Sequence, residues 1–186
     1  MFLLSLFVFS LIVSMVPFSV ALSSSVYRCI EWKETFRMAF VFGLFHAVMA
    51  AIGWGIGYGI KGWFYDMKYP VAIFLMLFIA FRLFMDSRRK NRQIRIVISE
   101  ESRILISFGL VTSINTALLG ISLGMIYTGI GFLAACVFGI VFLMTILGIR
   151  IGKLGVMNLG WIAELLGVAG LFMAGVVILL QYLRIM

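Results

Sequence analysis

Charged residues are scarce in this 186-residue chain: they make up 12% of it, while 64% of its residues are hydrophobic. A soluble domain is about half apolar and distributes charge over its whole surface. Here no Asp, Glu, Lys or Arg occurs in residues 1–27 or 104–149, and residues 38–60 contain only one His, His46. These long uncharged runs leave no room for a water-soluble domain and predict an integral membrane protein.

Cysteine and proline are also rare, with two residues of each. Cys29 and Cys136 fall in separate parts of the predicted fold, so we expect no disulfide and read both as small apolar residues. Pro17 lies inside the first apolar run and should kink that helix. Carbonyls freed by such a kink could contact an ion, and the kink could equally serve packing alone.

Groups for catalysis are missing. The chain has no Ser/His/Asp set, no Cys/His pattern of metal-ligand spacing and no phosphate-binding loop. We therefore expect no enzymatic activity and no resident cofactor.

The apolar runs predict an all-α integral membrane protein, because backbone polar groups in lipid must be bonded within a helix. A bilayer core takes roughly 20 apolar residues per helix. We predict six transmembrane helices in a single domain, over residues 3–24, 37–60, 69–87, 104–125, 130–151 and 158–182. The first run lacks the positive start of a secretory signal and is longer than its apolar core, so we expect it to be retained.

The formal net charge of +8 has a simple origin in the longest predicted loop, residues 88–103. Its basic residues are Arg88, Arg89, Lys90, Arg92, Arg95 and Arg103. The positive-inside rule places this loop in the cytoplasm of a bacterial inner membrane and both termini outside. Partners expected from this charge are the bilayer and its anionic lipids at the 88–103 loop, with no role for nucleic acid.

The two halves of the chain, residues 1–87 and 104–186, each hold three predicted helices of opposite topology. Such inverted three-helix repeats are common in secondary transporters. Short matches recur in the same order: Val41-Phe42-Gly43 with Val137-Phe138-Gly139, Gly53–Gly57 with Gly148–Gly152, and Ser14-Met15-Val16 with Ser113-Ile114-Asn115. Small-residue packing motifs can look alike by chance, but their common order favours an old duplication.

Four ionisable residues lie within predicted helices, where such groups are costly and by default functional. They are His46, Arg82, Asp86 and Glu164. We expect Arg82 to pair with Glu164 or with Asp86, although Asp86 could be interfacial and Arg82 could extend to the surface. Spacing alone favours His46 as a packing residue. The polar patch of Thr112, Ser113, Asn115 and Thr116 could line a cavity or bond across helices.

Several motifs resemble those of the manganese efflux pump family, in the lysine-exporter superfamily of six-helix carriers. They are Ser14-Met15 with Phe18, Glu34–Arg37 leading into Phe42-Gly43, Ile52–Gly55, Arg82–Asp86, Thr112–Ile114 and Ala163–Gly167. The resemblance implies export of Mn²⁺ from the cytoplasm through a site between the halves. It also implies aspartates at two central positions where this chain has Val16 and Asn115, and an acidic or amide residue in place of His46.

These departures remove negative charge that a hard dication requires. The resemblance then implies an ion path through Ser14, His46, Thr112, Asn115 and Glu164, supported by Arg82 and Asp86. Metal-ligand candidates among them are His46, Asn115 and Glu164. Two functions fit: a divalent-cation exporter with altered or weakened cation use, or a transport-inactive relative acting as an accessory membrane subunit. A homodimer or a membrane-protein partner is compatible with both. Export of an uncharged or amino-acid-like solute, as in the wider superfamily, is a third possibility.

Overall fold

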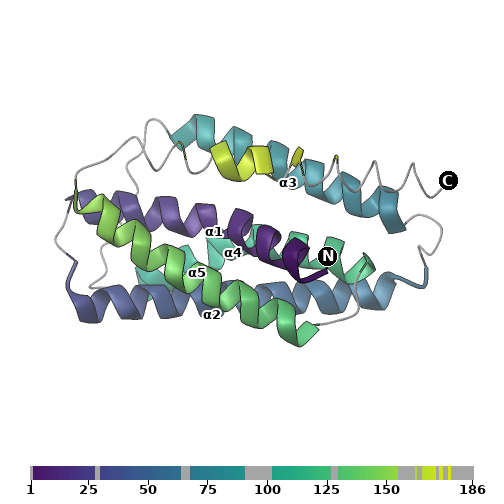
Figure 1. Cartoon of the computed structure of the whole chain (residues 1–186), viewed down its shortest axis with the longest axis horizontal. Helices are drawn as coiled ribbons and strands as arrows, with labels where there is room; N and C mark the ends of the chain where they lie inside the picture. Colours follow the sequence, from purple (N-terminus) through teal and green to yellow (C-terminus); the bar gives the residue numbers. More distant parts are fainter. Residues whose placement is uncertain are drawn as a thin grey trace.

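In the computed structural model the chain forms long helices whose axes run along the long dimension of the molecule (Figure 1). The structure describes residues 2–27, 30–63, 68–90, 102–126, 130–154, 162, 165–170, 172, 173 and 176. Its helices are α1 (Phe2–Tyr27), α2 (Trp32–Ile60), α3 (Lys68–Lys90), α4 (Ser102–Ile126) and α5 (Ile130–Gly152). The described residues of the sixth predicted span, 158–182, are helical as well, and no strand occurs in the described ranges.

The observed helices extend slightly beyond the predicted spans because their ends are built from polar residues that hydropathy alone excludes. Helix α2 begins at Trp32 rather than at residue 37, since Glu31 and Glu34 form a capping box there. The Glu31 amide donates to Glu34 Oε2 at 3.3 Å, and the Thr35 amide donates to the Glu31 carbonyl at 2.9 Å. These bonds satisfy backbone donors that the first turn would otherwise leave free.

The surface and the interior have the distribution expected of a membrane protein. In the part of the chain that the structure describes, three helical stretches are long and apolar enough to cross a membrane: Trp32–Ile60, Leu105–Ile126 and Phe132–Gly152. Phe9–Ser25 and Pro70–Met85 are shorter apolar helices. Large apolar side chains point outward, for example Phe74, Phe81 and Leu143, while many serines and threonines are buried. An apolar exterior of this extent suits lipid rather than water. The protein is therefore a membrane protein.

The buried hydroxyls bond mainly to the carbonyl oxygens of their own helix. Ser24 Oγ donates to the Val20 carbonyl at 2.7 Å, and Thr145 Oγ1 donates to the Val141 carbonyl at 2.7 Å. Ser122 Oγ likewise donates to the Leu118 carbonyl at 3.2 Å. These side chains are small and locally satisfied, which lets neighbouring helices approach closely without leaving polar atoms unpaired.

Glycines bring two pairs of helices into backbone contact. On α2, a Cβ at Gly53 or Gly57 would overlap the backbone of Ala117 or Ile121 on α4. On α5, a Cβ at Gly148 or Gly152 would collide with the carbonyls of Phe18 or Leu22 on α1. In both pairs the residue numbers increase together, so α2 runs parallel to α4 and α1 runs parallel to α5.

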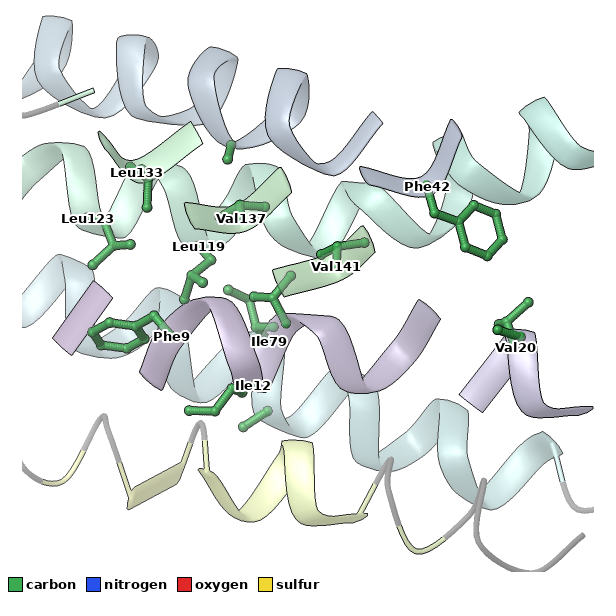
Figure 2. Close-up of a cluster of buried hydrophobic side chains, with 14 of the residues drawn as sticks. Phe9, Ile12, Val20, Phe42, Ile79, Leu119, Leu123, Leu133, Val137 and Val141 are labelled. Atoms are coloured by element: carbon green, nitrogen blue, oxygen red, sulfur yellow. The ribbon is translucent and has the colours of Figure 1, made fainter. Parts of the chain in front are cut away.

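The core lies where these two parallel pairs meet. Ring contacts join α2 to α5 in the antiparallel sense: Phe40 contacts Phe138 at a centroid distance of 5.9 Å, and Phe36 contacts Phe142 at 6.2 Å. One apolar cluster draws on all five helices and includes Phe9, Phe42, Ile79, Leu119 and Val137 (Figure 2). Helices α1 and α5, which run in one direction, thus pack against α2 and α4, which run in the other.

Candidate substrate cavity

A small cavity lies between α1, α3 and α4, near the middle of each helix. Its walls are Val13 and Val16 from α1, Ile79 and Leu83 from α3, and Thr112, Asn115, Thr116 and Leu119 from α4. Ile79 and Leu119 also belong to the apolar cluster around it (Figure 2). The cavity volume is about 10 Å³, close to the smallest space that can hold one water molecule.

The cavity wall carries two polar atoms without partners. Asn115 Oδ1 and Thr116 Oγ1 are buried and make no hydrogen bond to any residue that the structure describes, whereas Thr112 Oγ1 donates to the Phe108 carbonyl at 2.8 Å. Burying a polar atom without a partner costs about 1–3 kcal/mol. Since Asn115 and Thr116 both line the cavity, a water or a transported species there would satisfy them.

Val16 and Asn115 occupy matching places on α1 and α4. Two residues before each lies a buried serine with the same bond: Ser14 Oγ donates to the Leu11 carbonyl at 2.6 Å, and Ser113 Oγ donates to the Leu110 carbonyl at 2.9 Å. Ser14 therefore bonds to its own helix and is absent from the cavity wall, while Thr112 and Asn115 belong to it. The structure thus brings together two of the five residues predicted for the ion path.

His46 is fully buried on α2 and does not line the cavity. Its Nδ1 lies 2.8 Å from the Phe42 carbonyl oxygen. A carbonyl can only accept, so Nδ1 carries the hydrogen of this bond. Within the described ranges, its Nε2 has no hydrogen-bond partner. A packing histidine would have both ring nitrogens satisfied, and the described residues satisfy only Nδ1 of His46.

The predicted ion pairs lie partly outside the described residues. Arg82 is half-buried on α3, directly before the cavity residue Leu83. The side chain of Asp86 and the whole of Glu164 are outside the described part of the chain, as is Cys29. Pairing of Arg82 with either acid therefore stays a prediction.

The described cavity wall offers neutral oxygen atoms and no carboxylate. Among the described residues, no group of three or more His, Cys, Asp or Glu side chains could hold a metal ion together. Mn²⁺ prefers carboxylate, carbonyl and water oxygens, and a dication in a low-dielectric site needs negative charge nearby. This wall alone would bind such an ion weakly.

Of the wall residues from α1 and α3, only Val16 was singled out by a sequence motif, because Val13, Ile79 and Leu83 are ordinary apolar residues. Thr116 belongs to the polar patch for which the sequence left a cavity-lining role open: it follows Asn115 and lies one turn after Thr112, so the three share a helix face. That spacing does not reveal which neighbouring helices the face meets.

Comparisons with known proteins show the family to which this chain is related. A family model described as "Putative manganese efflux pump" matches residues 29–179. A protein named "Putative manganese efflux pump MntP 2" from Clostridium botulinum is 26% identical, over 99% of this chain and 97% of its own.

Two further relatives, both named "Putative manganese efflux pump MntP", come from Oleidesulfovibrio alaskensis and Serratia proteamaculans. They are 30% and 27% identical, each over 82% of both chains. No solved structure matches this chain. Because the family model covers most of its length, the chain belongs to the family of manganese efflux pumps.

Proposed function

We propose that this chain is a bacterial inner-membrane transporter of the manganese or divalent-cation efflux type, with its substrate path through the cavity between α1, α3 and α4. The observation that carries this proposal is the meeting of Val16 and Asn115 in one cavity wall near mid-helix. These are the two positions where the family resemblance implies aspartates. Transporters of inverted-repeat architecture bind their substrates near the bilayer midplane, where the repeats meet.

The packing supports two inverted three-helix repeats. Val16 and Asn115 are 99 positions apart, and the same spacing relates Phe18 to Ala117 and Leu22 to Ile121. The backbones of Phe18 and Leu22 lie against glycines of α5. Those of Ala117 and Ile121 lie against glycines of α2. Ser14 and Ser113, also 99 apart, make the same bond to the third residue before them. Exchanging the halves thus exchanges the α1–α5 contact with the α4–α2 contact.

The proposed topology follows from this arrangement and from the positive-inside rule. Both termini lie outside, and the 88–103 loop lies in the cytoplasm. Arg150 and Lys153 at the end of α5 are then cytoplasmic, together with the start of α2. Rocking of one half against the other would open the cavity to each side in turn.

Cation use by this chain should differ from that of a carrier with two central carboxylates. Asn115 and Thr116 can supply neutral oxygens, and Glu164 is the proposed source of negative charge or of a proton site. His46 is a further proposed contact on the path, since its Nε2 is buried without a partner. Arg82 and Asp86 are proposed as a supporting ion pair.

A second candidate function is that of an accessory membrane subunit that no longer transports. It is favoured by the cavity itself, whose described wall is mainly apolar and has room for about one water. The family scaffold, with its close glycine contacts, would then be kept for assembly with another membrane protein.

Manganese tolerance separates the two candidates. A bacterial strain lacking its own Mn²⁺ exporter would express this chain or the double variant Val16→Asp/Asn115→Asp. We expect the chain to protect the strain weakly and the variant to protect it more strongly, because two carboxylates restore the charge that a dication needs. A Gly55→Ala variant, altered where an added methyl meets open space, is the matched control.

Protection by the double variant alone, at equal membrane levels of both proteins, would favour the accessory-subunit function. Failure of both to protect would contradict a cation path through this cavity. Accumulation of ⁵⁴Mn²⁺ in inverted vesicles would confirm that protection reflects transport.

A further inference from the structure

Two basic side chains at the end of α5 are held against the start of α2. The guanidinium carbon of Arg150 lies 3.5 Å from the centroid of the Trp32 ring. Lys153 Nζ donates to the Ile30 carbonyl at 2.7 Å. Because Ile30 and Trp32 are neighbours in sequence, both cations converge on one short stretch at this end of the bundle.

The two contacts leave hydrogen-bond donors available. Arg150 meets the ring at short range, as in guanidinium stacking, which uses the face of the group and leaves N–H donors at its edge. Lys153 has three N–H donors, and its bond to Ile30 uses one. Both residues are exposed. A planar guanidinium edge beside an ammonium is a good match for a phosphate group.

An apolar strip continues from Trp32 along the outer face of α2 and α5. Trp32 stacks on Phe36 at a centroid distance of 5.9 Å, Phe36 contacts Phe142, and Phe138 contacts both Phe142 and Phe40. Trp32, Phe36 and Phe40 are each more than half exposed. We call this set, Trp32, Phe36, Phe40, Phe138 and Phe142, the aromatic strip.

We propose that this end of the α2–α5 pair binds an anionic phospholipid, with its phosphate at Arg150 and Lys153 and an acyl chain along the aromatic strip. A tryptophan at the membrane interface with basic residues beside it is suited to a lipid headgroup. Charge at this end favours an anion: Lys33 and Arg37 add to the two cations, against Glu31 and Glu34. Glu34 is already engaged by the Glu31 amide.

Thermal unfolding of the purified full chain in detergent tests the proposal. Phosphatidylglycerol and phosphatidylcholine with identical acyl chains would be added separately, and the difference between their two Tm shifts would be compared among variants. Arg150→Gln and Lys153→Gln should each clearly reduce this difference, and Arg150→Lys should recover only part of the loss. Because each variant is compared with itself, a change in its basal stability cancels.

The matched control is Lys61→Gln, at the opposite end of α2, where Lys61 Nζ lies 5.7 Å from the Tyr58 ring. It should keep the full lipid difference. Equal losses in Lys61→Gln and Arg150→Gln, or no difference between the lipids for the unaltered chain, would overturn the proposal. Soluble glycerol phosphate should give no shift, and a shift as large as that of the lipid would exclude a role for the aromatic strip.

Discussion

At the scale of single residues, Asn115 is the side chain whose burial needs an explanation. Its amide oxygen lines a mainly apolar cavity without a partner in the described part of the chain, while the nearby hydroxyls of Thr112 and Ser113 bond to their own helix. A leucine would fill a similar volume without the cost of an unpaired polar atom. The asparagine thus lowers stability, as expected of a residue on the proposed substrate path.

Asn115→Leu should therefore raise the thermal stability of the purified protein, by about 1–2 kcal/mol, because it removes an unsatisfied buried oxygen. It should also abolish whatever manganese tolerance the chain confers. Thr112→Val is the control, since the Thr112 hydroxyl already bonds to the Phe108 carbonyl and its loss should change stability little. Clear destabilisation by Asn115→Leu would mean that the oxygen is bonded in the membrane, most simply through a water in the cavity.

At the scale of helices, the positions of glycine determine which helices pack in close backbone contact. The apolar runs predicted where helices occur, but hydropathy does not choose among neighbours, because every helix is apolar around most of its circumference. The glycines of α2 and α5 specify the neighbours, because they lie where the backbones of α4 and α1 make close contact. Their spacing was visible in the sequence, whereas the identity of the facing helix required the structure.

Gly53→Ala should destabilise the protein by about 1–3 kcal/mol or more, because its methyl group would overlap the Ala117 carbonyl and force α2 and α4 apart. Gly55→Ala is two residues away on the same helix and meets nothing within 4 Å. It should be neutral or slightly stabilising, since alanine favours helix more than glycine does. Thermal unfolding in detergent measures both, and equal effects would contradict close packing of α2 on α4.

At the scale of the whole molecule, the sequence was most informative about class and least informative about the site. Charge-free runs predicted an all-helical membrane protein, and the motifs around Ser14, Arg82 and Glu164 indicated the family that the comparisons confirm. The cavity could not be predicted in the same way. Five of its eight wall residues are aliphatic, and although Val16 was notable as a departure from the family motif, only the fold shows that it shares a cavity with Asn115.

The orientation of the molecule gives a last prediction, because α2 and α5 run antiparallel and their ends must lie on opposite sides of the membrane. Trp63 follows α2 and Leu154 follows α5, and both side chains are strongly exposed, at 91% and 77%. Single cysteines would be placed there, as Trp63→Cys and Leu154→Cys, in a background of Cys29→Ser and Cys136→Ala. A membrane-impermeant maleimide should label Trp63→Cys in intact cells and Leu154→Cys only after permeabilisation.

The labelling pattern tests the helix packing and the membrane orientation separately. Labelling of both cysteines in intact cells would contradict the antiparallel packing of α2 and α5 through Phe40 and Phe138. Labelling of Leu154→Cys alone would keep the fold but reverse its orientation, and the basic 88–103 loop would then lie outside, against the positive-inside rule. The expected pattern would place Arg150 and Lys153 at the cytoplasmic leaflet, where anionic lipid is available to them.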